Sequence, residues 1–201
     1  MGKFVLKVAL STVAAIFAVL LLVYGFFALF LPAPLASFYE NLGNYSGAVR
    51  LMKRAYDKSE SEEDLKRLAE LLCFKEENAE LSAEYVTKYC DGESFKKYCK
   101  EEKDGQAYYD LMTASSVKSL YIVGKPDDAL KKASEYLAYY SSSYPSGSSL
   151  RALMFAATDK KDKQTLAKIL EKLNSFDLSS FTETEKATIE DDKQNIQIII
   201  G

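Results

Sequence analysis

The stretch that decides the fold is PLASFYENLGNYSGAVRLMKRAYDKS, residues 34–59. Gly43 separates two segments in which apolar and small residues recur every three or four positions, the spacing typical of amphipathic helices. Ala36 and Ala48 lie one on each segment, where small side chains let two helix backbones approach closely, and bulkier residues fill the gaps around them. The stretch therefore predicts a tightly packed antiparallel helical hairpin.

The same helical period continues toward the C-terminus. Apolar stripes alternate with turn-forming residues such as Asp91-Gly92 and Gly124-Lys125-Pro126, and strand-like alternation is confined to the terminal IQIII. The sequence predicts an all-α protein made of antiparallel helical hairpins. We expect hairpins at about residues 33–58, 61–90, 104–141 and 147–174, closed by a capping helix at about 182–199.

Residues 34–59 also resemble one tetratricopeptide repeat, a two-helix unit of about 34 residues. The resemblance is carried by Leu35, Ala36, Tyr39, Gly43, Tyr45, Ala48, Met52 and Ala55. A later unit aligns Leu120, Gly124 and Ala129 with Tyr39, Gly43 and Ala48, although Val117 replaces its small residue. The resemblance implies a solenoid of such hairpins over about residues 33–174. Irregular helical hairpins without true repeats are the alternative.

The resemblance further implies a binding groove, because the first helices of tetratricopeptide units line a concave face that receives an extended peptide or a partner helix. The positions carried over are Lys66, Glu70, Lys118, Tyr121, Arg151 and Phe155. This mixed set does not reproduce the clamp of lysines and asparagines that some family members use for C-terminal carboxylates, so the type of ligand stays open. An ordinary solvated helix face is the alternative for each residue.

Ahead of the hairpins, residues 8–31 read VALSTVAAIFAVLLLVYGFFALFL without a charge. At about 1.5 Å of rise per residue, this run is long enough to cross a hydrocarbon core of roughly 30 Å. Lys3 and Lys7 make the flank at residues 1–7 cationic, which favours a cytoplasmic N-terminus. We therefore expect an uncleaved signal anchor with residues 32–201 outside a bacterial plasma membrane. A cleaved signal peptide is the alternative, although its apolar core is usually only about 7–15 residues long.

The composition lacks residues that the commonest catalytic and metal-binding sites require. The chain has no His, three Cys and a formal net charge of −3. Pairs of Ser or Cys with His, His-ligated zinc and four-thiolate zinc sites are therefore excluded, and neither common phosphate-binding loop occurs. The mild acidity also argues against nucleic acid as a partner. We predict no catalytic residue, cofactor or metal, and hence no enzyme.

Two of the cysteines form a candidate disulfide. Cys90 and Cys99 enclose the short stretch DGESFKKY, and an extracytoplasmic domain would meet an oxidising milieu. Three unpaired cysteines are the alternative. Cys73 lies in the apolar string LLCF and is expected in the core.

These observations favour a membrane-anchored adaptor or scaffold that holds a protein or peptide partner at the extracytoplasmic face. A structural subunit of a larger membrane complex is an alternative, with a span that packs through its small residues Ala14, Ala15, Ala18 and Gly25. A His-independent enzyme or ligand-binding module is a further alternative.

Overall fold

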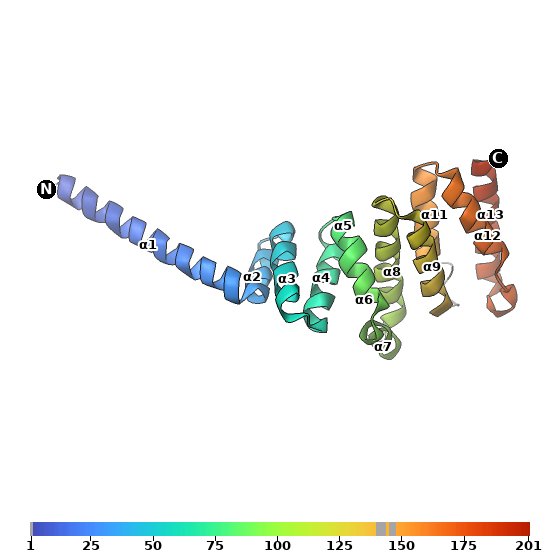
Figure 1. Ribbon diagram of the computed structural model, residues 1–201, viewed down its shortest axis with the longest axis horizontal. Helices are drawn as coiled ribbons and strands as arrows, with labels where there is room; N and C mark the ends of the chain where they lie inside the picture. The colour runs from blue at the N-terminus through green and yellow to red at the C-terminus, as the bar shows by residue number, and fades with distance from the viewer. Residues whose placement is uncertain (1, 140–143, 145–147) are drawn as a thin grey trace. The chain divides into compact units, whose positions relative to one another are not determined.

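A computed structural model describes residues 2–139, 144 and 148–201, and every regular element among them is helical (Figure 1). No strand occurs in these ranges, so the predicted all-α class is confirmed. The expected hairpin ends at 140, 141 and 147, together with the side chains of the flank at 1–7, lie outside the described residues.

The chain divides into two compact units, Met1–Leu68 and Ala69–Gly201. The boundary falls inside one helix, and the expected domain at residues 32–201 stays a prediction. The first unit holds three helices and the beginning of a fourth: α1 (Gly2–Phe30), α2 (Pro32–Asn41), α3 (Tyr45–Ser59) and α4 (Glu62–Phe74).

Helix α1 is long, apolar and unburied. Its segment Leu10–Phe30 is long and apolar enough to cross a membrane, and its side chains are exposed rather than packed into a core. The helix ends at Phe30 because Pro32, which has no backbone N–H to donate, starts α2 at its first position. By length and composition, α1 is the one candidate span among the described residues.

The hairpin of α2 and α3 forms as the sequence predicts (Figure 1). Gly43 has a φ of +72°, in the left-handed region that favours glycine, and Asn44 caps α3 by accepting a hydrogen bond of 2.9 Å from the Gly47 amide. Ala36 and Ala48 are fully buried. A Cβ atom on Gly47 would lie 2.2 Å from the Tyr39 ring, so the two helices meet where only small residues fit.

We predict that Ala48→Leu lowers the free energy of unfolding by about 1–3 kcal/mol, because the larger side chain overpacks this crossing. The measurement is thermal or denaturant unfolding of the full chain in mild detergent. Ala138→Leu, at an exposed position on another helix, serves as the matched control. Equal stability of the two variants would show that α2 and α3 do not pack closely at Ala48.

The second unit continues as a series of helices from the end of α4. They are α5 (Ala79–Leu81), the π-helix η1 (Ser82–Val86), α6 (Thr87–Asp91), α7 (Glu93–Glu101), α8 (Gly105–Ile122), α9 (Pro126–Tyr139), α11 (Ser149–Asp159), α12 (Lys163–Asn174), the 3₁₀-helix η3 (Leu178–Ser180) and α13 (Glu183–Ile200). Helix α8 packs against α9 and α11, and α12 packs against α11 and α13. Gly124 turns the chain between α8 and α9 with a φ of +82°.

Helix α7 lies between the predicted hairpins at about residues 61–90 and 104–141, and aromatic packing holds it in place. Phe95 is fully buried, with its ring centroid 5.0 Å from that of Tyr89 and 5.4 Å from that of Tyr109. A Cβ atom on Gly105 would lie 1.9 Å from the carbonyl oxygen of Cys99. The start of α8 therefore has to be glycine where it crosses the end of α7.

The predicted bond between Cys90 and Cys99 is not formed in this structure, where none of the three cysteines takes part in a disulfide. Cys90 and Cys99 are both buried, and Cys73 is partly buried. Burial raises the pKa of the Cys90 thiol well above its ordinary value. Both buried thiols therefore pack here as small apolar side chains.

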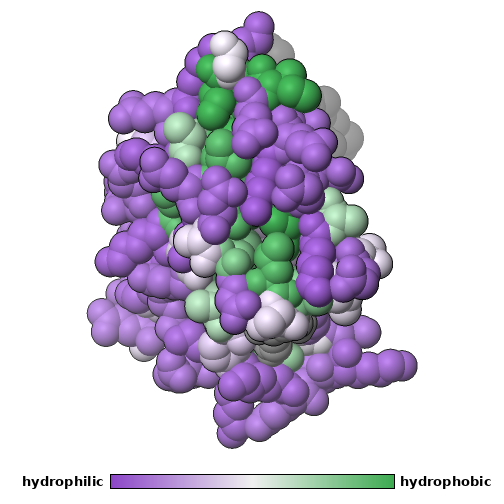
Figure 2. Space-filling model, turned by 90° about the vertical axis from the view of Figure 1, so that its right-hand side faces the viewer, coloured by the Kyte–Doolittle hydropathy of each residue, from purple (hydrophilic) through white to green (hydrophobic). Residues whose placement is uncertain are grey.

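Helix α13 closes the second unit. Its first turn carries a capping box, in which the Thr182 hydroxyl accepts from the Glu185 amide and the Glu185 carboxylate accepts from the Thr182 amide. Ile189 and Ile196 are fully buried, while Ile198 is strongly exposed. Figure 2 views this C-terminal end, where apolar residues form a band between hydrophilic ones. The end of the chain therefore retains apolar surface.

Candidate functional site

Two adjoining hollows in the second unit form the candidate site, and we call them together the α8 groove. One hollow of about 470 Å³ lies between α8 and α11, and one of about 430 Å³ lies between α8 and the α4–α5 segment. Leu111 on α8 lines both. The groove is therefore built along one helix, which supplies side chains to each hollow.

The hollow between α8 and α11 exists because small residues face each other there. Ala107 and Ala114 on α8 stand opposite Ala152 on α11 and leave the space between the helices open. At its edges, Leu111 and Phe155 keep 57% and 53% of their surface exposed. Exposed side chains of this size around a concavity are typical of a surface that binds a partner.

The hollow toward α4 continues the apolar surface. Phe74 and Ile122 are exposed and line it, while Lys118 and Glu77 bring one charge of each sign. Cys73 also lines it, and its thiol lies 3.8 Å from the Leu111 carbonyl oxygen. Burial raises the pKa of this thiol, which favours its protonated form over the reactive thiolate.

Three of the predicted groove residues line the α8 groove. Arg151 and Phe155 line the hollow toward α11, and Lys118 lines the hollow toward α4. Glu70 accepts a hydrogen bond of 2.9 Å from the Tyr108 hydroxyl. Lys66 belongs to the first unit and is half-buried there.

Tyr121 lines neither hollow. Its side chain is only 6% exposed, and its hydroxyl donates a hydrogen bond of 3.1 Å to the Asp162 carboxylate. Burial and this hydrogen bond raise the pKa of Tyr121 to about 12. Tyr121 therefore ties α8 to the start of α12 and has little surface to offer a partner.

Arg151 has a structural partner in addition to its place in the groove. Its Nε atom lies 2.8 Å from Asp192 Oδ2, and Asp192 also accepts a hydrogen bond of 2.9 Å from the Tyr144 hydroxyl. Asp192 is buried, so removal of Arg151 would leave an uncompensated carboxylate at a cost of about 3–5 kcal/mol. The Arg151 guanidinium also lies 5.2 Å from the centroid of the Phe155 ring. Arg151 therefore anchors α13 and positions Phe155.

The apolar residues Phe74, Leu111 and Ile122 were not among the predicted site residues. A signal for two of them was present, since Leu111, Lys118 and Ile122 follow the three-and-four spacing of one helix face. The prediction carried over two positions per helix from the tetratricopeptide pattern and did not extend along that face.

The described residues contain no group of three or more His, Cys, Asp or Glu side chains that could hold a metal. The two buried carboxylates, Glu185 and Asp192, are engaged in the capping box and in the ion pair with Arg151. Both have roles in holding α13.

Asp162 is the N-cap of α12, and its ionisation makes the stability of the second unit depend on pH. Partial burial raises the pKa of this carboxyl, but hydrogen bonds from the hydroxyl and amide of Thr165 and from Tyr121 lower it more, so that the pKa falls below its ordinary value. Such a shift stabilises the fold above the unfolded-state pKa of about 3.9, and the stabilisation is lost as the pH falls through the lower folded-state pKa.

We predict that Asp162→Asn reduces the loss of stability between about pH 5 and about pH 2.5, because asparagine keeps the capping acceptor and removes the titrating charge. Unfolding at both pH values measures the effect. Asp159→Asn, which changes an exposed carboxyl at the end of α11, is the control. If both variants follow the unsubstituted chain, the bonds to Asp162 do not contribute.

Comparisons with protein-family models, with curated proteins and with solved structures found no match to this chain.

Proposed function

We propose that this chain is a membrane-anchored, non-enzymatic adaptor that holds a protein partner in the α8 groove. The observation that carries the proposal is the groove itself, in which Leu111 and Phe155 stand exposed beside open space. Monomeric surfaces rarely keep several large apolar side chains exposed around one concavity unless another surface covers them.

The chemistry of the groove supports a peptide segment as the partner. Both hollows are lined by residues of α8, and each combines apolar residues with charges of both signs: Asp110 and Arg151 in one hollow, Glu77 and Lys118 in the other. An amphipathic helix that places apolar side chains in such a groove gains most of its binding energy from a few anchors. The surrounding charges would then orient it.

The proposed location of the adaptor is supported by α1. The helix has the length and apolar surface of a span, and the cationic flank before it favours a cytoplasmic N-terminus. The proposal therefore places the helical hairpins at the extracytoplasmic face of a bacterial plasma membrane, with a tetratricopeptide-like arrangement.

We predict that a membrane-impermeant protease added to intact spheroplasts removes the chain after about residue 35, because the Lys3 and Lys7 flank holds the N-terminus inside. Immunodetection of tags at both ends gives the readout. Lysed spheroplasts provide the control for cleavage itself. Digestion only after lysis would show the opposite orientation.

We predict that Leu111→Ala combined with Phe155→Ala weakens partner capture by about 1–2 kcal/mol or more, because both side chains are exposed anchors of the groove. The measurement is quantitative recovery of co-purifying proteins in mild detergent. Phe38→Ala combined with Leu42→Ala is the matched control, since these residues are 57% and 66% exposed and lie in the first unit.

Melting temperatures of both double variants should stay close to that of the unsubstituted chain, because exposed side chains contribute little to folding. Full partner recovery by a folded groove variant would contradict the proposal. Arg151→Ala is unsuitable for this test, because the unpaired Asp192 would lower stability directly.

A structural subunit of a membrane complex is the second candidate, and the small residues of α1 favour it. Ala14, Ala18 and Gly25 are four and seven residues apart, on one face of the helix, and a Cβ atom on Gly25 would meet nothing within 4 Å. Such a face lets another span approach closely. The same purification separates the candidates: fixed stoichiometry with other membrane proteins favours the subunit, and a reversible soluble partner favours the adaptor.

A further inference from the structure

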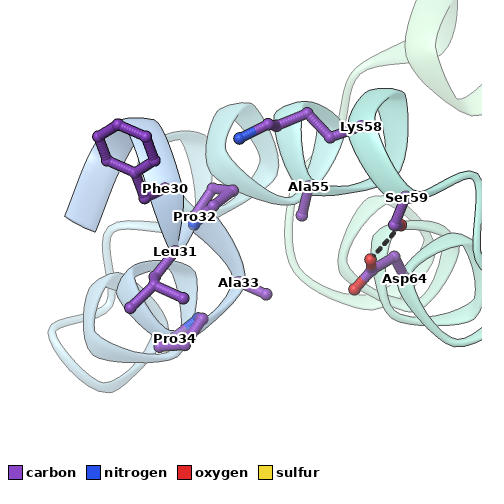
Figure 3. A pocket seen from close by; sticks show the side chains of 9 residues that line it. All are labelled: Phe30, Leu31, Pro32, Ala33, Pro34, Ala55, Lys58, Ser59 and Asp64. Atoms are coloured by element: carbon purple, nitrogen blue, oxygen red, sulfur yellow. Dashed lines mark hydrogen bonds between the residues drawn. The ribbon is translucent and has the colours of Figure 1, made fainter. Parts of the chain in front are cut away.

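A separate hollow lies in the first unit, at the point where α1 ends (Figure 3). It has a volume of about 310 Å³. Phe30 and Leu31 at the end of α1 and Pro32 and Pro34 at the start of α2 form its apolar side. The hollow is therefore an apolar recess directly at the end of the candidate span.

Lys58 supplies the positive charge of this hollow. Its Nζ atom donates a hydrogen bond of 2.8 Å to the Leu29 carbonyl oxygen, one of the last carbonyls of α1, which has no helical amide to accept from. The same ammonium lies 5.8 Å from the centroid of the Phe30 ring. Within the described part of the chain, Lys58 forms no ion pair with a carboxylate.

Asp64 supplies the negative charge. It comes from the first turn of α4 and accepts a hydrogen bond of 2.5 Å from the Ser59 hydroxyl, as Figure 3 shows. Among the residues that the structure describes, Asp64 also makes no ion pair, either with Lys58 or with any other cation. The hollow thus holds one cation and one anion that do not neutralise each other.

We propose that this hollow binds the headgroup of an aminophospholipid of the phosphatidylethanolamine class. The lipid phosphate contacts the Lys58 ammonium, and the lipid ammonium donates to the Asp64 carboxylate. The apolar side at Leu31 and Pro34 receives the beginning of the acyl chains. A zwitterionic ligand satisfies both charges at once, whereas a purely anionic headgroup leaves Asp64 facing a like charge.

The position of the hollow supports this ligand. The inference rests on α1 being the membrane span of the proposed function, because a span that ends at Phe30 brings the hollow to the level of the headgroups. Lysine at a span end characteristically extends its ammonium toward that level. A choline headgroup fits less well than ethanolamine, since its quaternary ammonium has no N–H to donate to Asp64.

The test uses the full chain, purified in mild detergent, stripped of lipid and titrated with phosphatidylethanolamine, phosphatidylglycerol or phosphatidylcholine. Native mass spectrometry counts the bound lipid. We expect phosphatidylethanolamine to bind at least about fivefold more tightly than the other two, the ratio that about 1 kcal/mol supplies. Asp64→Asn should remove the preference for phosphatidylethanolamine over phosphatidylglycerol. Lys58→Gln should weaken the binding of these two lipids by a similar factor.

Matched variants serve as controls for this titration. Lys53→Gln on α3 and Glu63→Gln beside Asp64 change exposed or half-exposed charges that do not line the hollow, and they should bind as the unsubstituted chain does. Lys58→Arg keeps the charge and should keep the lipid. Equal binding of all three lipids, or a selectivity that Asp64→Asn leaves unchanged, would overturn the proposal.

Failure of the span itself has a different readout. Release of the full chain from membranes by alkaline carbonate would show that α1 is not integral, whatever the lipid titration gives. A chain that resists extraction and shows no headgroup preference would retain the membrane anchor and lose only the lipid site.

Discussion

Close approach of helix backbones at small residues is the constraint on which the rest of the structure depends. In the first unit, Ala36 and Ala48 are fully buried at the crossing of α2 and α3, and Gly105 sits against the backbone of Cys99 in the second. Where small residues lie at a crossing, the helices close on each other. Ala107 and Ala152 lie beside a crossing instead, and the space that they leave becomes the α8 groove.

The helices could be predicted from the sequence because their signals are local. Apolar period, turn glycines and capping residues act within a few positions, and Gly43 and Gly124 both adopt the positive φ that their turns require. Which side chains of α8 are buried and which line the groove could not be predicted in the same way. Tyr121 and Ile122 are adjacent and both apolar, yet one is buried against Asp162 and the other lines the groove. Because α8 is covered from several sides, its period alone does not tell which face stays open.

The ion pair of Arg151 and Asp192 could not be predicted from the sequence for a different reason. The two residues are separated by 41 positions, and only the folded unit shows that Tyr144 joins them. Arg151 was predicted from the tetratricopeptide pattern as a groove residue. The structure adds that its guanidinium holds α13 to α11 while supporting the Phe155 ring. This charge pair, in which the carboxylate is buried and the guanidinium partly exposed, thus ties the terminal helix to the helix that lines the groove.

In the proposed membrane-anchored arrangement, the charges that direct insertion of the span differ from the charge, Lys58, that the folded chain places at the end of the span. The orientation of a span is set by charges close to it in the chain, so Lys3 and Lys7 weigh more in that step than a lysine 29 residues beyond Leu29. Folding of α2 and α3 then returns Lys58 to the end of α1, where its ammonium meets a helix carbonyl. In the proposed arrangement, a cation that contributes little to insertion therefore lies at the level of the headgroups after folding, because the short hairpin of α2 and α3 brings it there.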